Sequence, residues 1–237
     1  MERSIRRRIV TWACAIAIVL AGTMCILVYN ARRGAKRNTE AGRLQQLFGA
    51  FLNYEEIHGR FPPASVADHT GRPAHSWRVL LLPFLGHDAL YREYDFREPW
   101  DGPHNRRLWG RMPDVFHCAR SSDAEHTCFV AIIDDHGFWR NNGEVRASHV
   151  KDGLIVSVMF VRHPDSDIRW TEPRDLDWAD LKASINQAKG DSGAKMLFMF
   201  GSGMAREIPL ELGADRIHGI ITIDGGEDVA ALGIFKD

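Results

Sequence analysis

The longest apolar run of the chain extends from Ile9 to Tyr29 and holds 21 residues without a charge. About 20 residues of helix, at 1.5 Å each, cross a hydrocarbon core of roughly 30 Å. A core helix of a soluble domain shows one apolar stripe and a polar face, so this run predicts a transmembrane helix over 9–29. Residues 1–8 form a short basic tail before it.

After the run the pattern becomes amphipathic, with apolar residues at steps of three and four positions. We expect a helix that starts at Ala31, continues to His58 and ends at Gly59, because glycine is a common helix stop. Its apolar face predicts packing on the domain that follows. That face consists of Ala41, Leu44, Leu47, Phe48, Phe51, Leu52 and Ile57.

The domain begins with loops and short helices. Proline and glycine interrupt 60–75 and 95–105, which predicts loops in both places. Between and after them, capping residues and a further proline indicate short helices. The expected helices are 77–82, with Ser76 as N-cap and Pro83 as stop, 88–94, with Asp88 as cap, and 106–110.

From residue 115 onward, short runs of β-branched and aromatic residues indicate strands. One helix over 177–187, capped by Asp177, interrupts them. This order predicts an α+β fold in which the long N-terminal helix packs on a small antiparallel sheet, within a single domain over 30–237. The expected strands are 115–118, 128–133, 154–161, 195–200, 206–209 and 219–223.

Charge is divided unevenly along the chain, although its net value is −1. Residues 1–43 carry nine Lys or Arg and two Asp or Glu, whereas the remainder carries 21 and 29. An acidic body lacks the basic surface of a nucleic-acid binder, so no nucleic-acid partner is expected. The basic segment flanks the apolar run, where it can contact anionic lipid head groups.

The apolar run is longer than the core of a signal peptide, and no A-x-A cleavage site follows it. We therefore expect an uncleaved signal anchor. Lys and Arg are almost equally numerous on both sides of the run, so their count decides no orientation. A long following domain is translocated largely regardless of flanking charge, which predicts a single-pass cell-membrane protein with its bulk on the extracytoplasmic (periplasmic) side.

The four cysteines form two pairs along the sequence. Cys14 and Cys25 lie on nearly one helical face of the apolar run, where packing is favoured over a seam between two anchors. Cys118 and Cys128 lie in the body, and outside the cytoplasm they are expected to form a local disulfide. A zinc site would favour the tighter C-x-x-C spacing, so metal is the less favoured interpretation.

Five blocks stand in order: H-G-R-F-P-P at 58–63, H-S-W-R-V-L-L-L-P-F-L at 75–85, L-Y-R-E-Y-D-F-R-E-P-W-D-G-P-H-N-R-R-L at 90–108, W-T-E-P-R-D-L at 170–176 and I-T-I-D-G-G-E at 221–227. Together they resemble a large planctomycete family of prepilin-like proteins that carry a domain of unknown function. The resemblance implies a type IV pilin-like or pseudopilin-like α+β fold on a long N-terminal helix, facing out of the cytoplasm. It implies no enzymatic activity.

Two positions depart from the pattern of that family. Pilins carry a processing site of Gly followed by Phe-Thr-Leu, with a Glu inside the apolar run, whereas R-I-V-T-W at 8–12 has no Gly and the run has no Glu. Cleavage by a prepilin peptidase and pilus-type polymerisation are therefore both disfavoured. The late family block F-x-D-G-S reads F-M-F-G-S at 198–202, without the Asp.

Two serine strings match fragments of hydrolase motifs. G-D-S-G at 190–193 matches the string around the nucleophile of chymotrypsin-like proteases, but the His-containing block of that family is missing upstream. Ser202 lies in G-S-G, whereas a nucleophile elbow needs G-x-S-x-G. Both strings are expected to be turns, and no catalytic residue is expected.

Metal-binding patterns are weak throughout. The eleven histidines include no H-x-H and no i, i+4 pair, so loop and surface histidines are favoured over a metal site. Asp134-Asp135, and Asp224 with Glu227 and Asp228, lack the D-x-D-x-D-G calcium loop, so solvated acidic turns are favoured. We expect no cofactor and no bound metal.

The most distinctive local string is W-D-G at 100–102, followed by Asn105. In the favoured structural interpretation Asp101 caps the following turn and Trp100 packs over a helix, because aromatic side chains bury large areas. The alternative is a ledge that binds a sugar or a peptide. The residues of this structural element or ledge are Trp77, Pro83, Trp100, Asp101, Gly102 and Asn105, with Trp109 nearby.

The expected function is that of a membrane-anchored, extracytoplasmic, prepilin-like protein in envelope structure or assembly, without catalysis. Its expected partners are membrane lipid and, through the N-terminal helix, other protein subunits. The alternative is a membrane-tethered module that binds a ligand, a metal or an envelope polymer. A hydrolase is the third and least favoured class.

Overall fold

The computed structural model describes residues 24, 41–117, 124–140, 143–154, 156–164, 166–188 and 193–226. The chain divides into two units, Met1–Ala41 and Gly42–Asp237, and nearly all described residues belong to the second. The predicted tail over 1–8 and, apart from Met24, the predicted transmembrane helix over 9–29 lie outside the described residues. Among the residues that are described, no helix combines the length and the apolar character needed to cross a bilayer.

The expected amphipathic helix is confirmed over residues 41–58. Its buried stripe centres on Phe51, which is fully buried and contacts the rings of Phe61, Trp139 and Phe160 at centroid distances of 5.0, 5.0 and 5.4 Å. The helix ends before Gly59, whose positive φ of 68° is readily adopted by glycine alone. Ile57 was expected on the buried face, but it is 70% exposed.

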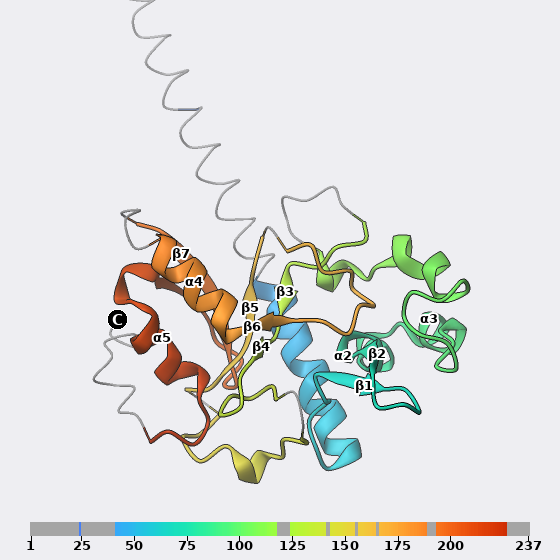
Figure 1. Cartoon of the computed structure of the whole chain (residues 1–237), viewed down its shortest axis with the longest axis horizontal. Helices are drawn as coiled ribbons and strands as arrows, with labels where there is room; N and C mark the ends of the chain where they lie inside the picture. Colours follow the sequence, from blue (N-terminus) through green and yellow to red (C-terminus); the bar gives the residue numbers. More distant parts are fainter. Residues whose placement is uncertain are drawn as a thin grey trace, which may run out of the picture. The chain divides into compact units, whose positions relative to one another are not determined.

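Four strands form an antiparallel sheet in the order β3-β5-β7-β8, of which the first three are labelled in Figure 1. This confirms the expected small antiparallel sheet and the strands over 195–200 and 206–209. The predicted strand over 128–133 is interrupted at Ala131, so that only its first half joins this sheet. The strands are β3 (Phe129–Val130), β5 (Val158–Arg162), β7 (Lys195–Phe200) and β8 (Ala205–Pro209).

Two further strand pairs lie outside this sheet. β1 (Ser65–Ala67) and β2 (Pro73–Ser76) form an antiparallel hairpin within the segment expected to be a loop. β4 (Ile132–Ile133) pairs in parallel with β6 (Leu176–Asp177), which directly precedes the helix α4 (Trp178–Ala188). The fold is therefore α+β with small sheets, of which one pair is parallel.

Short helices connect and cover these strands. Ser76 is the N-cap of α2, as expected, because its hydroxyl accepts the backbone N–H of Arg78. The cap of α3 is His87 rather than the expected Asp88, which is the first residue of the helix. The helices are α2 (Trp77–Leu80), η1 (Leu82–Leu85), α3 (Asp88–Glu93), η2 (Asn105–Arg111), η3 (Asp114–Phe116), η4 (Ala147–His149), α4 (Trp178–Ala188), η5 (Leu210–Leu212) and α5 (Ala214–Ile221).

Two predicted strands are wrong. Val115 and Phe116 belong to the 3-10 helix η3. Residues 219–221 end the helix α5, because Ile217, Ile220 and Ile221 follow helical spacing and all three are buried on one face. In both places a β-branched or aromatic run is buried by a helix, which overrides its strand propensity.

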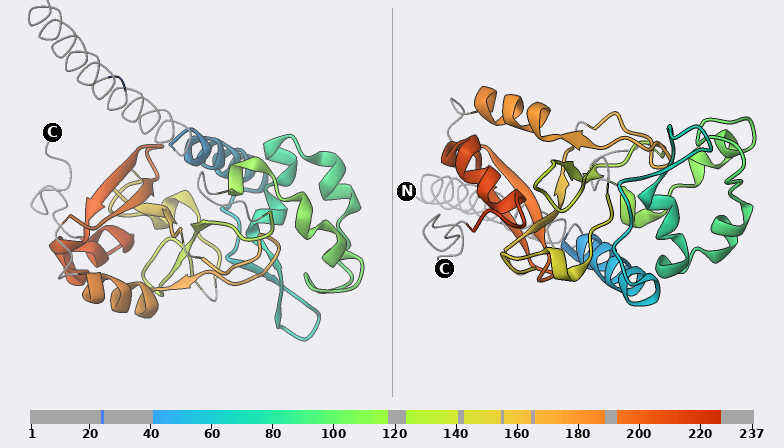
Figure 2. Two further views of the ribbon diagram at one scale, coloured as in Figure 1. Left: turned by 90° about the horizontal axis from the view of Figure 1, so that it is seen from above. Right: turned by 60° about the horizontal axis from the view of Figure 1, so that its bottom comes forward.

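The four-stranded sheet separates two apolar cores. Phe129, Phe160 and Met199 belong to the core that contains Phe51 of the helix over 41–58. Val130 and Phe198, their strand neighbours, belong to the core formed with α4 and α5. The domain therefore has three layers, which Figure 2 shows: the helix over 41–58 (blue) lies on one side of the sheet, and α4 (orange) and α5 (red) lie on the other.

Candidate functional site

Trp77 and Arg78, at the start of α2, are both fully buried. Trp77 Nε1 donates to Asp175 Oδ2 at 2.8 Å, and Arg78 Nη2 donates to Asp175 Oδ1 at 2.5 Å. The backbone N–H of Ala131 also donates to Oδ1, at 2.9 Å. The carboxylate therefore joins α2 to the β3–β4 region and to the segment before β6.

This ion pair is enclosed by the protein. The side chains of Arg78 and Asp175 are 0% and 1% exposed. Burial raises the pKa of the Asp175 carboxyl, while Arg78 and the N–H donors oppose that rise. Because all its partners belong to the protein, the arrangement fixes the fold, and Trp77 cannot take part in a surface ledge.

The loop between α3 and η2 is built around Asn105, whose side chain is fully buried. Its Nδ2 donates to the carbonyls of Asp95 and Pro99 at 2.9 and 3.1 Å, and its Oδ1 accepts the N–H of Asp95 at 3.0 Å. Asn105 thus replaces the backbone hydrogen bonds that an irregular loop lacks.

Gly102 lies against the carboxylate of Glu98. A Cβ atom at position 102 would lie 2.5 Å from Glu98 Cδ. Glu98 Oε1 in turn accepts the backbone N–H of Asn105 at 2.6 Å. The glycine is therefore required for close approach of a side chain that closes the loop.

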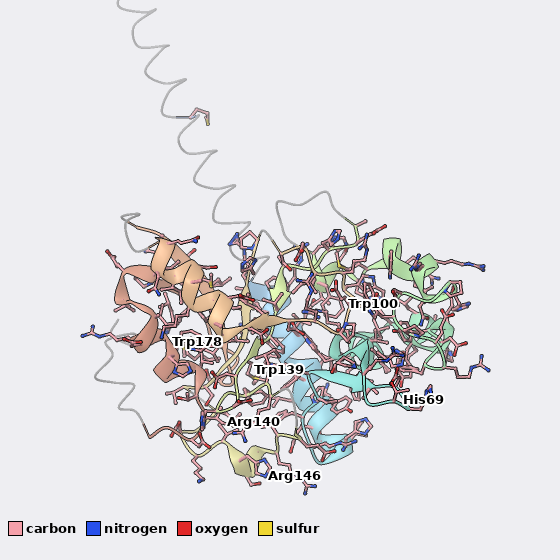
Figure 3. All side chains as sticks on the ribbon, viewed as in Figure 1. His69, Trp100, Trp139, Arg140, Arg146 and Trp178 are labelled. Carbon is pink, nitrogen blue, oxygen red and sulfur yellow. The ribbon has the colours of Figure 1, made fainter. Side chains whose placement is uncertain are left out.

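Trp100 is half-buried and stacks on Trp109, with ring centroids 5.5 Å apart (Trp100 is labelled in Figure 3). The guanidinium of Arg169 lies 4.2 Å from the centroid of the Trp109 ring, a cation–π contact. Asp101 faces Arg106 at 3.8 Å and does not cap η2, whose N-cap position is His104 without a side-chain hydrogen bond. Trp100 therefore packs as expected, whereas the cap predicted at Asp101 is wrong.

Pro83 lies in the first turn of η1, one element beyond α2. The structure brings Trp100, Asp101 and Gly102 into the loop that Asn105 closes at the start of η2, whereas Trp77 is buried in the core. The six predicted residues therefore do not form one surface.

The histidines include one buried member that differs from the expected surface positions. His75 is 4% exposed, and its Nδ1 lies 3.0 Å from the Tyr94 hydroxyl. Burial lowers the pKa of His75, so its neutral form is favoured. Within the described ranges, no cluster of three or more His, Cys, Asp or Glu has the geometry of a metal site.

The two acidic turns differ from each other. Asp134 is not solvated as expected: its side chain is 10% exposed, and His218 Nε2 lies 3.0 Å from its Oδ2. Asp224 keeps a partly exposed side chain, and the following Gly225 and Gly226 donate their N–H groups to Asp152, each at 3.0 Å. Glu227 and Asp228 lie outside the described residues.

The structure describes only one of the two serine strings and one of the two cysteines of the body. Ser202 lies in the tight β7–β8 turn, as expected, and Ser192 lies outside the described residues. Cys128 is 2% exposed and disulfide-bonded. Cys118 lies outside the described residues, so its pairing with Cys128 stays a prediction.

Sequence reasoning missed two interactions, Arg78–Asp175 and Asp134–His218. Asp175 stands in the W-T-E-P-R-D-L block and Arg78 in the S-W-R-V block, so both lay within recognised strings. Their 97-residue separation left no local signal that the two blocks meet.

Similarity to known proteins was found for one segment of the chain. No curated protein matches the chain, and no solved structure matches it. Residues 30–134, somewhat less than half of the chain, match the model of a family described as "Protein of unknown function (DUF1559)". That segment, which contains the helix over 41–58, the β1–β2 hairpin and the Asn105 loop, is thereby similar to a domain of unknown function.

Proposed function

We propose that the chain is a membrane-anchored, extracytoplasmic, prepilin-like protein that serves in envelope structure or assembly and has no catalytic role. The observation that carries the proposal is the seating of the helix over 41–58. Phe51 is fully buried between Phe61, Trp139 and Phe160, so the helix is held against one face of an antiparallel sheet. Upstream of it, the sequence from Ile9 to Tyr29 has the length and composition of a membrane span.

This packing attaches the helix over 41–58 rigidly to the domain, as a connection to a membrane anchor requires. Burying one Phe contributes about 1.5–3 kcal/mol, and Leu44 and Leu47 on the same stripe are also fully buried. A helix fixed in this way moves with the body of the domain. Arg78 and Asp175, whose charged side chains are almost completely buried, bind one another, which favours a structural role over chemistry.

Topology is tested with single cysteines in a chain whose Cys14 and Cys25 are changed to Ser. Thr70→Cys, at the exposed tip of the β1–β2 hairpin, is expected to react with a membrane-impermeant maleimide in intact spheroplasts. Ser4→Cys in the basic tail is the matched control and should react only after the membrane is opened. Labelling of Thr70→Cys only after lysis would overturn the extracytoplasmic placement, and recovery of the full chain without detergent would overturn the anchor.

The second candidate is a membrane-tethered binding module. It is favoured by a pocket of about 390 Å³ beside the β1–β2 hairpin, within the usual size range of ligand sites. The state of the protein in a detergent extract distinguishes the two candidate functions. A high-order complex that dissociates when the helix over 41–58 is altered supports assembly, whereas a monomer that binds a small partner supports the module.

A further inference from the structure

The pocket beside the β1–β2 hairpin has two extended walls. Ser65 and Ala67 of β1 form part of one wall, and Asp175 and Asp177, around β6, form part of the other. Both β1 and β6 belong to two-stranded pairs, so in the described part of the chain each has a hydrogen-bonded neighbour on one side only. Strand edges of this kind bind extended peptides through main-chain groups.

The hairpin wall is held in shape by Asp68. Its Oδ1 accepts the Thr70 N–H at 2.8 Å, the Thr70 hydroxyl at 2.6 Å and the Arg72 N–H at 3.0 Å. These bonds hold the pKa of the Asp68 carboxyl well below its usual range. The tip, marked by His69 in Figure 3, is therefore ordered by its own turn.

The opposite wall of the pocket is held in place by buried hydrogen bonds. Asp175 is tied to Arg78, Trp77 and Ala131, as described above. Two walls that are ordered before binding lose little conformational entropy when a ligand enters. The pocket is thus preformed.

The uncompensated charge in this pocket is negative. Arg174 at the rim is shared between Glu172 at 2.7 Å and Asp167 at 3.0 Å. The carboxylate of exposed Asp177 makes no ion pair or hydrogen bond with any residue that the structure describes. Three charged residues line the pocket: Arg174, Asp175 and Asp177. Arg78 balances Asp175, and the two carboxylates that bind Arg174 balance that arginine, so the charge of Asp177 is left without a partner.

We propose that this pocket binds a lysine or arginine side chain carried on an extended segment of a partner protein. The cation pairs with Asp177, and the peptide backbone lies along the free edge of β1 or β6. The alkyl part of the side chain contacts Pro73 and Pro173, and the small side chains of Ala64 and Ala67 leave the space for it. A pocket of about 390 Å³ has room for one long side chain with its flanking backbone. The proposal does not depend on membrane anchorage.

The test uses the full chain in detergent micelles and two capped pentapeptides, Ala-Ala-Lys-Ala-Ala and the same peptide with norleucine in place of lysine. Binding of the lysine peptide is expected to be about tenfold tighter, since a charge-assisted hydrogen bond is lost with norleucine. Zero-length carbodiimide coupling should join the peptide lysine to Asp177, as mapped by mass spectrometry.

Three variants complete the test. Asp177→Asn should weaken lysine-peptide binding about tenfold. Asp180→Asn, an exposed carboxylate outside the pocket, should leave it unchanged. Ala67→Trp, at an exposed strand position, should abolish binding by filling the pocket while the thermal midpoint is retained. Equal binding of the two peptides, no binding of the lysine peptide, full binding by Asp177→Asn, or cross-links that map elsewhere would each overturn the proposal.

Discussion

Asp175 accepts a hydrogen bond from Arg78 at 2.5 Å, although 97 positions separate the two residues in the sequence. The same carboxylate accepts from the Trp77 ring and from the backbone of Ala131, so three distant segments meet at one side chain. A buried ion pair adds little net stability compared with apolar packing, but the loss of one partner leaves the other charge buried and unpaired.

Asp175→Asn removes the charge while keeping the shape of the side chain. Arg78 then has no counter-charge in the core, so the free energy of unfolding is expected to fall by about 3–5 kcal/mol. Urea denaturation of the full chain in detergent micelles measures this loss. Asp167→Asn is the matched control: Asp167 also pairs with an arginine but is 82% exposed, and its loss should change stability little. If both variants lost the same free energy of unfolding, burial of the Arg78–Asp175 pair could not be the reason for the loss.

Gly102→Ala places a methyl group against Glu98 Cδ, which lies 2.5 Å from the position of that new atom. The Glu98 side chain must move and release the Asn105 N–H, so we expect a loss of about 1–2 kcal/mol. Gly110→Ala is the control, because a Cβ there meets no atom within 4 Å. In the Glu98→Ala background, Gly102→Ala should cost much less; an unchanged cost would place the effect in the backbone instead.

His75 should make stability depend on pH. Because burial lowers the pKa of His75 below its usual 6.5, the unfolded chain binds the proton more readily than the folded chain. The contribution of neutral His75 to the free energy of unfolding is therefore fully present above about pH 6.5 and is lost as the pH falls below that value. His75→Gln, which can still bond the Tyr94 hydroxyl, should reduce the difference in denaturation midpoint between about pH 7.5 and about pH 5. A difference as large as in the unmodified chain would assign the effect to other groups.

Features decided by near neighbours were predictable from the sequence. The apolar stripe with Phe51 at its centre, the stop at Gly59 and the cap at Ser76 each depend on residues within one or two turns. The β7–β8 hairpin was found for the same reason, since Gly203 provides the positive φ of 78° in its turn.

Features decided by distant contacts were not predictable in this way. Ile217, Ile220 and Ile221 have strand propensity, but α5 buries all three against the sheet. Glu98 and Gly102 are only four positions apart, but their contact was missed too, because the irregular loop that joins them has no regular spacing from which to infer it. The pocket beside β1 joins residues about 100 positions apart. One of its walls lies partly in the W-T-E-P-R-D-L block, but nothing in that block indicates that it meets β1.

The pairing of Cys118 with Cys128 is the last prediction. Cys128 is buried and disulfide-bonded, and its carbonyl accepts the N–H of His163 at 2.7 Å, so the bond is expected to fix one end of the 118–128 loop to the strand region. Closing a loop of this size contributes roughly 2–4 kcal/mol. Cys118→Ser should therefore lower the free energy of unfolding by about that amount, whereas Cys14→Ser and Cys25→Ser should not. Peptide mapping without reductant checks the connectivity directly: alkylation of Cys118 in the denatured, unreduced chain would show that Cys128 pairs elsewhere.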